Sequence, residues 1–316
     1  MNNIVEIIKN TNSWNIPEIG QDIPHGDMPG DKVEIGQDHI NKSKLIFGEL
    51  LKMLPGVLEG SENNRAVITV CGGSGVGKSE IASLLSFYLN QLGIGSYTLS
   101  GDNYPRRIPK YNDAERLRIF RLSGVQALVK EEWMNEEIFG VLRELQEKDD
   151  DGNKAYLQQY PWFQSYLDGA LKGLKEYLGT KNEIDFDELS TIVKQFKEGA
   201  DAIWLKRMGR TESDLWYEKV DFSSIHVLVI EWTHGNSNNY EGVDIPVLLN
   251  STPEETLAHR RSRNRDGKTD SPFTMRVLEI EQQMLDSQAH KAKIIVSKLG
   301  ELITFEEYKS LMAVSK

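Results

Sequence analysis

A glycine-rich run that ends in Lys-Ser is the stretch of this chain with the clearest chemistry. From Gly72 to Ser79 it has the pattern G-x-x-x-x-G-K-S. Glycines allow backbone N–H groups to turn inward around an anion, and the start of a helix adds a positive dipole end. The Lys78 amine can reach the β- and γ-phosphates of a nucleotide, and the Ser79 hydroxyl can ligate Mg²⁺. The residues expected to bind a nucleoside triphosphate are Gly72, Gly73, Ser74, Gly75, Val76, Gly77, Lys78 and Ser79.

The segments on both sides of this loop support the phosphate-binding interpretation. Residues 66–71 form a short, β-branched apolar run that is typical of a buried parallel strand. Residues 81–92 carry apolar side chains at helical spacing. A glycine-rich turn without a ligand would need neither flank, so the sequence favours a strand–loop–helix phosphate site.

Two acidic residues stand at the ends of further predicted strands. Asp102 follows a short strand at 96–100, and Glu231 ends a buried apolar strand at 224–231. In α/β proteins, ligands bind at the carboxyl ends of parallel strands. We therefore expect both strands to flank the phosphate-loop strand and both carboxylates to converge on Mg²⁺ and the γ-phosphate. Ser79 and Glu231 are the predicted metal ligands. The alternatives are a turn Asp that bonds its own backbone and a surface Glu.

Several arginines are candidates for contacts with phosphate. A predicted helix at 252–265 is basic in its second half, where Arg261 and Arg265 share one face. In an acidic protein with a phosphate loop, such a cluster favours a lid that clamps phosphate, although a solvated helix face is the simpler alternative. Arg207 and Arg210 could hold an acidic or phosphorylated acceptor, and a plain surface role explains them equally well.

Composition narrows the class of protein. The chain has 316 residues, a net charge of −11 and a single cysteine. The charge argues against nucleic acid as a partner, and the apolar runs are too short to span a membrane. No secretory signal pattern is present, so we expect a cytoplasmic protein. Cys71 lies at the end of a predicted strand, which favours a small buried residue over a redox role.

The remaining chain is predicted mainly from periodicity and loop composition. Residues 1–37 are rich in Gly, Pro, Asn and Asp and are expected to form a loop or loose arm. Residues 113–179 are expected to be mostly helical. The other predicted elements are helices at 38–54, 186–196 and 305–314 and strands at 202–205, 244–250 and 291–296.

The order of these parts resembles that of the uridine kinase, phosphoribulokinase and pantothenate kinase group of P-loop kinases. Residues 101–104 are similar to the Asp-Ser-Phe-Tyr element of that group, and 184–189 to its Asp-Ala-Phe-Asp helix start. Residues 229–231 are similar to its Glu-Gly strand end, and 261–266 to its arginine lid. Residues 292–298 resemble the strand near the adenine in pantothenate kinases. The shared order, rather than any single element, carries the resemblance.

The resemblance implies an α/β fold, a P-loop NTPase-type three-layer sandwich with a central, mostly parallel sheet. It also implies an ATP-dependent kinase that uses Mg²⁺ and phosphorylates a hydroxyl of a small metabolite. Asp102 would orient or deprotonate that hydroxyl, and Lys78, Arg261 and Arg265 would hold the transferring phosphoryl group. Tyr104 and Asp185 lie in two of these matched elements and are weaker substrate candidates.

Three features depart from the group. Trp232 stands where a Gly usually follows the acid, and Trp204-Leu205-Lys206-Arg207 replaces a Pro-x-Tyr-Asp element. A long segment, 106–181, has no counterpart of that length in uridine kinases. The expected domains are therefore an N-terminal arm and helix (1–63), a kinase core (64–105 and 182–316) and a large helical insertion (106–181). The insertion could wall the acceptor cleft or form a homodimer interface.

Two other classes of function stay open from the sequence. A nucleotide-dependent switch would carry Asn-Lys-x-Asp after the P-loop, and this is absent, while Asp27-Met28-Pro29-Gly30 mimics a switch element on the wrong side of the loop. A kinase-derived binding protein that has lost its chemistry is the other alternative, and Trp232 is the residue that favours it. The expected partner is a small-molecule hydroxyl acceptor rather than nucleic acid or a membrane.

Overall fold

The computed structural model describes residues 3–11, 17–19, 23, 25–263 and 271–314. Its contacts divide the chain into two compact units, which we call the sheet unit and the helical unit. The sheet unit consists of residues 1–104, 185–252 and 285–316, and the helical unit of residues 105–184 and 253–284. The helical unit thus contains the predicted insertion and also residues 253–284, which the sequence had assigned to the core.

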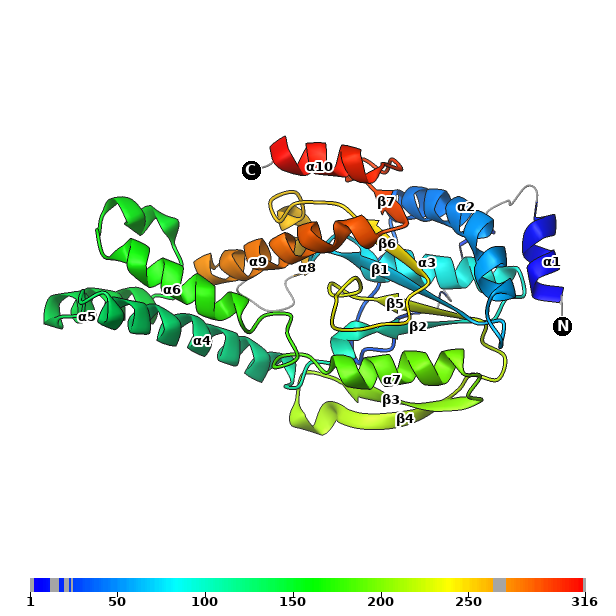
Figure 1. The fold of residues 1–316 in the computed structure, drawn as a ribbon, viewed down its shortest axis with the longest axis horizontal. Coiled ribbons are helices and arrows are strands. Elements are labelled where there is room, and N and C mark those ends of the chain that lie inside the picture. The colour runs from blue at the N-terminus through cyan, green and yellow to red at the C-terminus, as the bar shows by residue number, and fades with distance from the viewer. Residues whose placement is uncertain (1–2, 12–16, 20–22, 24, 264–270, 315–316) are drawn as a thin grey trace. The chain divides into compact units, whose positions relative to one another are not determined.

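A five-stranded sheet forms the centre of the sheet unit. Its strands are β1 (Ala66–Gly72), β2 (Ser96–Ser100), β5 (Val227–Glu231), β6 (Ile245–Leu249) and β7 (Ile294–Val296). They lie in the order β2-β5-β1-β6-β7, from bottom to top in Figure 1, and every neighbouring pair is parallel. The predicted α/β fold with a parallel sheet is therefore confirmed.

The strand order corrects one expectation. β5 flanks β1, as predicted, but β2 pairs with β5 and does not touch β1. In the register of the sheet, Glu231 is paired with Val70 of β1 on one side and with Ser100 of β2 on the other. Both predicted acidic strand ends therefore reach the same edge of the sheet as the P-loop, with Glu231 between the other two strands.

The sheet is covered on both faces, as a parallel sheet requires. Ile68 and Val70 point into a core formed with α2 (Gln37–Glu59) and α3 (Lys78–Gln91). The next residue, Cys71, belongs to a second core, which includes Tyr308 of α10 (Phe305–Val314). This alternation produces the three layers that the resemblance implied.

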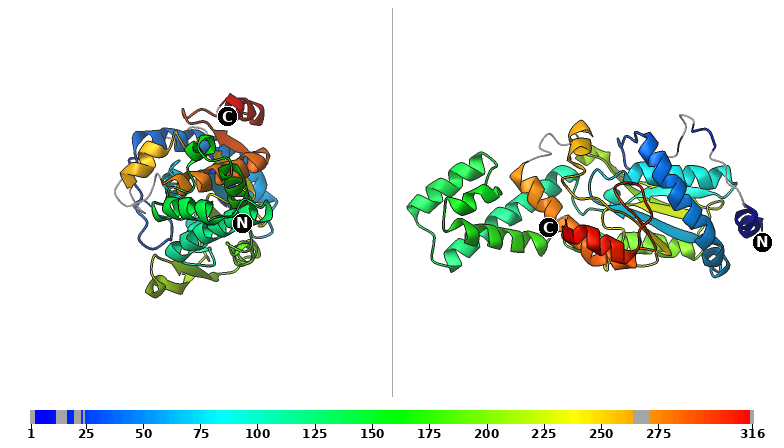
Figure 2. Two further views of the ribbon diagram at one scale, coloured as in Figure 1. Left: turned by 90° about the vertical axis from the view of Figure 1, so that its left-hand side faces the viewer. Right: turned by 90° about the horizontal axis from the view of Figure 1, so that it is seen from above.

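The N-terminal segment is more ordered than the sequence suggested. Residues Asn3–Asn10 form a helix, α1, whose Val5 and Ile8 join the core beside α2. Figure 2 shows α1 at the end of α2, where Lys9 forms an ion pair with Glu59. The expectation of a loose arm was therefore wrong for this stretch, because two buried apolar side chains hold it.

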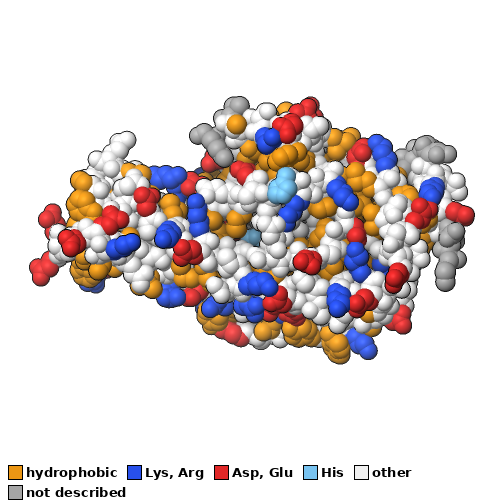
Figure 3. Space-filling view, in the orientation of Figure 1, with side chains coloured by type: hydrophobic (Ala, Val, Ile, Leu, Met, Phe, Trp, Pro, Cys, Tyr) orange, Lys and Arg blue, Asp and Glu red, His pale blue; other side chains and the backbone are white. Residues whose placement is uncertain are grey.

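An antiparallel hairpin, separate from the main sheet, completes the sheet unit. The predicted strand at 202–205 extends to β3 (Ala202–Met208) and pairs with β4 (Leu215–Asp221), which the sequence analysis missed. The hairpin lies beside α7 (Phe186–Lys197) in Figure 1. Its exposed apolar side chains are Trp204, Leu215, Trp216 and Tyr217. Figure 3 shows apolar surface along the lower edge of the molecule, where Figure 1 places the hairpin.

The helical unit has a core of its own. Its helices are α4 (Pro109–Lys130), α5 (Glu136–Glu147), α6 (Phe163–Lys175), α8 (Leu257–Arg263) and α9 (Pro272–Gln288), the last of which ends in residues assigned to the sheet unit. Phe120, Phe163 and Tyr166 are fully buried between them. Gly124 lets α4 and α6 approach closely, because a Cβ there would lie 2.5 Å from the Tyr166 ring. Within the described residues, no helix combines the length and apolar character needed to cross a bilayer.

The environment of Cys71 predicts an unreactive thiol. The residue is fully buried, and burial raises the pKa of its thiol to about 12, although the Lys78 charge opposes this. Since only the thiolate reacts, its fraction at neutral pH is about 10³-fold lower than for a free cysteine. We expect iodoacetamide to modify the native protein negligibly and the denatured protein completely, as measured by mass spectrometry. Rapid stoichiometric labelling of the native protein would show that Cys71 is accessible.

Candidate active site

The P-loop has the strand–loop–helix geometry that its sequence predicts. It connects β1 to α3, and Gly77 precedes the helix in the left-handed region, with a φ of 97°. A Cβ at Gly77 would lie 2.9 Å from the imidazole of His39, which belongs to α2 and packs against the loop. The Lys78 amine donates a hydrogen bond to the Gly73 carbonyl (3.0 Å) across the loop. The loop thus has both the backbone conformation and the lysine that phosphate binding requires.

Glu231 connects the P-loop to the neighbouring strands. Its side chain is buried at the end of β5, where the Ser79 hydroxyl donates to one carboxylate oxygen at 3.2 Å. The Ser100 hydroxyl, from the end of β2, donates to the other oxygen. One carboxylate therefore links three segments: the first turn of α3, β5 and β2.

The surroundings of Glu231 disfavour its negative charge and so favour a cation beside it. Burial, followed by the charge of Asp102, raises the pKa of Glu231, whereas the Ser100 hydrogen bond and the Lys78 charge lower it. A divalent cation would oppose both of the raising effects. Mg²⁺ takes oxygen ligands and is usually held by one or two protein groups together with phosphate oxygens. The Ser79 hydroxyl and the Glu231 carboxylate fit that pattern.

Asp102 lies in a short 3₁₀ helix, Gly101–Asn103, directly after β2. Its side chain is exposed, while its neighbours Gly101 and Asn103 are buried. The charge of Asp102 acts on the buried Glu231, so the two acids share one end of the sheet. The structure thus brings together four of the predicted residues, Lys78, Ser79, Glu231 and Asp102.

The weaker substrate candidates lie in different surroundings. Tyr104 is fully buried, its hydroxyl has no hydrogen-bond partner within the described residues, and the Lys206 ammonium lies 5.4 Å from its ring centroid. Asp185 caps α7 by accepting the Glu188 N–H (3.2 Å). Arg207 is buried and paired with Asp27, and Arg210 is exposed beyond the end of β3.

The two lid arginines are not both within the described residues. Arg261 is exposed on α8 of the helical unit. Arg265 lies outside the described residues. Their role as a phosphate clamp stays a prediction.

Sequence reasoning missed several polar residues on the hairpin side of Asp102. Lys206 pairs with Glu188 of α7 at 3.4 Å, and the Tyr217 hydroxyl donates to the same carboxylate at 2.7 Å. Asp27, from the N-terminal segment, is buried next to Ser100. No spacing in the sequence links these residues, because they come from the arm, α7 and two strands of the hairpin.

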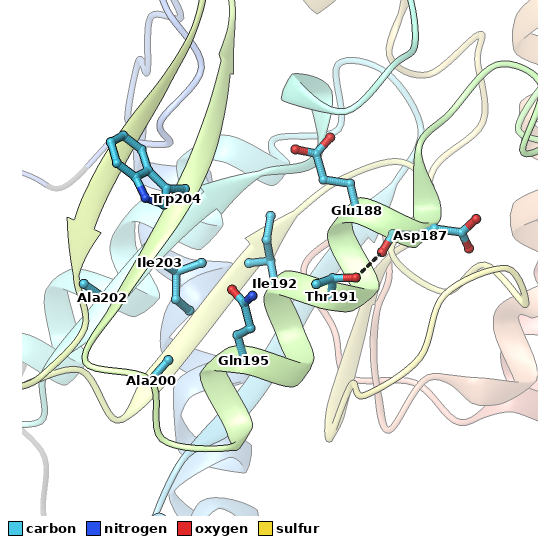
Figure 4. Close-up of a pocket in the computed structure, with 9 residues that line it drawn as sticks. All are labelled: Asp187, Glu188, Thr191, Ile192, Gln195, Ala200, Ala202, Ile203 and Trp204. Atoms are coloured by element: carbon cyan, nitrogen blue, oxygen red, sulfur yellow. Dashed lines mark hydrogen bonds between the residues drawn. The ribbon is translucent and has the colours of Figure 1, made fainter.

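A pocket between α7 and β3 is distinct from the phosphate site. Figure 4 shows its lining, in which the Thr191 hydroxyl is bonded to the Asp187 carbonyl within one turn of α7. Its lining residues are Asp187, Glu188, Thr191, Ile192, Gln195, Ala200, Ala202, Ile203 and Trp204. Neither a P-loop residue nor Asp102 is among them, so this pocket does not hold the reacting phosphate.

The structure explains how Trp232 fits where the resembling kinases have Gly. Its indole is buried, 5.3 Å from the Phe186 ring and 6.1 Å from the Tyr240 ring by centroid distance. It also lies against Gly101, where a Cβ would approach the indole to 2.1 Å. Trp232 is therefore a packing residue beneath the turn that carries Asp102, while the Glu231 carboxylate faces Ser79.

Comparison with known proteins gives one close relative. The chain is 39% identical over 253 residues to a bifunctional alpha-galactosidase/sucrose kinase of Mediterraneibacter gnavus. The match includes 80% of this chain but 22% of that protein, so this chain spans about a fifth of its relative's length. No known family model matches the chain.

Two solved structures align with most of this chain at low sequence identity. A D-glycerate 3-kinase of Cryptococcus neoformans aligns over 83% of this chain and 97% of its own, with 13% identity and a TM-score of 0.46. A putative fructose transport system kinase of a Silicibacter species aligns over 75% of this chain and 93% of its own, with 13% identity and a TM-score of 0.44.

The contact between Gly101 and Trp232 predicts that the turn tolerates no side chain. Gly101→Ala should destabilise the protein by about 1–3 kcal/mol or more, because the methyl group overlaps a buried indole. Gly48→Ala is the control, since nothing lies near that exposed position in α2, and a gain of about 0.5–1 kcal/mol is expected there. Chemical denaturation measures both. Equal stability of the two variants would contradict the packing described for Trp232.

Proposed function

We propose that this chain is an ATP-dependent kinase that transfers the γ-phosphoryl group to a hydroxyl of a small metabolite. The observation that carries the proposal is the contact of 3.2 Å between the P-loop hydroxyl of Ser79 and the Glu231 carboxylate, with Asp102 on the same edge. This combines a phosphate-binding loop, a pair of oxygen ligands and a second acid with an exposed side chain. Phosphoryl transfer needs little more, since its catalysis is mostly positioning and charge neutralisation.

Each residue has a distinct part in the proposed reaction. The N–H groups of the P-loop and the Lys78 amine bind the β- and γ-phosphates, which requires Lys78 to leave the Gly73 carbonyl. Ser79 and Glu231 would hold Mg²⁺, which supplies positive charge against the phosphate oxygens when bound. Asp102 orients the acceptor hydroxyl and takes its proton as the oxygen attacks the γ-phosphorus, while the bond from that phosphorus to the bridging oxygen breaks and ADP leaves.

For the acceptor, we propose a sugar, with sucrose as the first compound to test. The support is the 39% identity to a protein whose name includes sucrose kinase, over most of this chain. The rival class, a binding protein without chemistry, was favoured by Trp232 alone. Because that indole packs under Gly101 and leaves the Glu231 carboxylate directed at Ser79, no observation now favours the rival.

The assay that tests this function measures ADP release from Mg-ATP with a panel of acceptors: sucrose, glucose, fructose, uridine, glycerate and pantothenate. We expect sucrose to raise the rate above the acceptor-free background. Lys78→Ala should lower turnover by about 10²–10³-fold, because it removes a charge that stabilises the transferring group. If no acceptor raises the rate and calorimetry detects no ATP binding, the proposed function is wrong.

A second experiment addresses the proposed base. Asp102→Asn should lower kcat by about 10²–10⁴-fold while ATP affinity stays nearly the same, because the amide cannot accept the proton. Asp221→Asn, an exposed position on β4, is the control and should behave as the wild type. Wild-type kcat in Asp102→Asn would remove this residue from the mechanism.

A further inference from the structure

The segment from His25 to Asp31 contacts the residues of the proposed active site. A Cβ on Gly26 would lie 3.5 Å from Oε1 of Glu231 and 3.8 Å from Cβ of Ser100. The charge of Asp31 is also close enough to act on Glu231. The Asp-Met-Pro-Gly motif at 27–30 imitates a switch element in the sequence. In the structure it lies beside the carboxyl ends of β2 and β5, next to Ser100 and Glu231.

Asp27 is the anchor of this segment. Its Oδ1 accepts two hydrogen bonds of 2.8 Å, one from the backbone N–H of Ser100 and one from the side-chain amide of Asn103. Its Oδ2 accepts from the Tyr97 hydroxyl at 3.0 Å and from the Arg207 guanidinium at 2.8 Å. The side chain is only 7% exposed. Both oxygens are thus fully used inside the protein.

These bonds bracket the proposed catalytic acid. Ser100 and Asn103 stand at the two ends of the turn that carries Asp102. The Ser100 hydroxyl bonds the Glu231 carboxylate, and the Asn103 side-chain carbonyl accepts the Met208 N–H of the hairpin at 2.9 Å. A single carboxylate from the arm therefore holds the start of the turn, its end and, through Arg207, the hairpin.

An ion pair between Asp27 and Arg207 that served only stability would not need the further hydrogen bonds from Ser100, Asn103 and Tyr97. Burying two charges costs desolvation free energy that their attraction often fails to repay, so such a pair is weak evidence for stability. Burial indeed raises the pKa of Asp27 to about 6 despite the nearby Arg207 charge. What the four donors provide is a fixed geometry on both sides of Asp102, and a displacement of about 1 Å can cost about 10²-fold in rate.

We propose that Asp27 is a positioning residue of the active site, which fixes the Gly101–Asn103 turn and thereby the carboxylate of Asp102. The inference rests on the proposed kinase function for its kinetic consequence. Its structural consequence, a loosened turn when Asp27 is changed, does not depend on that function. The segment before the P-loop is then part of the catalytic unit and not a loose arm.

The test uses Asp27→Asn in the full chain, which keeps the shape of the side chain but removes its charge. We expect kcat with the best acceptor to fall by about 10- to 100-fold, with the KM for ATP within about twofold of the wild type. Asp244→Asn is the matched control. Asp244 also accepts a backbone N–H, from Val67 at 2.8 Å, and a lysine, Lys197 at 2.7 Å, but at the opposite end of β1. The Asp244→Asn variant should be less stable than the wild type but should keep its kcat.

Hydrogen exchange distinguishes a failure of this inference from a failure of the proposed function. In Asp27→Asn, amide exchange should accelerate in a peptide covering residues 100–104 and stay unchanged in one covering β1. If the wild type transfers no phosphate, the function is wrong, and the exchange result still tests the anchor. If the wild type is active and Asp27→Asn keeps both its kcat and its slow exchange, the inference is overturned.

A second variant covers the case in which Asp27→Asn does not fold. Arg207→Lys keeps the positive charge but cannot bond Asp27 and Tyr97 together as the guanidinium does. Positioning predicts a smaller fall in kcat, of about 3- to 10-fold, with an unchanged KM for the acceptor. A raised KM for the acceptor with an unchanged kcat would instead indicate that Arg207 contacts the substrate. This outcome would contradict the proposed positioning role of Asp27.

Discussion

The parallel pairing of β5 between β1 and β2 brings Glu231, the P-loop and the turn that carries Asp102 to one edge of the sheet. It fixes Glu231 in register with Val70, just before the P-loop, and with Ser100, just before the turn that carries Asp102. Parallel strands cannot be joined by tight turns, so the chain must leave the sheet between them. The long excursion between β2 and β5 contains most of the helical unit, α7 and the hairpin. Within the sheet unit, the shared sheet edge therefore brings together the P-loop, the end of β2 and the end of β5.

The same pairing creates an electrostatic problem. Glu231 is buried with Asp102 nearby, and an uncompensated buried charge is expensive. Two hydroxyl donors and the Lys78 charge compensate it only in part, and Lys78 is meanwhile bonded to the Gly73 carbonyl. Nucleotide binding would draw Lys78 to the phosphates, and a divalent cation would then balance the carboxylates. Phosphate and metal binding are thus expected to favour one another at this site.

Sequence reasoning succeeded where the signal is local. The P-loop, the helix after it and the apolar strands are each encoded in a few neighbouring residues, and all of them are found in the structure. The prediction that β2 lies beside β1 was wrong, since no local pattern in the sequence tells whether β2 pairs with β1 or with β5. Asp27 falls in a stretch that is predicted to be a loop or loose arm, because Gly, Pro and Asp are typical of loops. Its partners, from Tyr97 to Arg207, are far away along the chain.

The hairpin and the turn that carries Asp102 depend on such distant contacts throughout. A two-stranded hairpin is at best marginally stable alone, and here it is held by Arg207 with Asp27, Met208 with Asn103, and Lys206 with Glu188. The donor side, in contrast, is built into the first strand and helix of the sheet. The backbone of the P-loop therefore follows from residues that are neighbours in the sequence, whereas the turn that carries Asp102 also depends on the arm and the hairpin. This separation gives a physical reason why one phosphate-binding core can serve kinases that act on different small molecules.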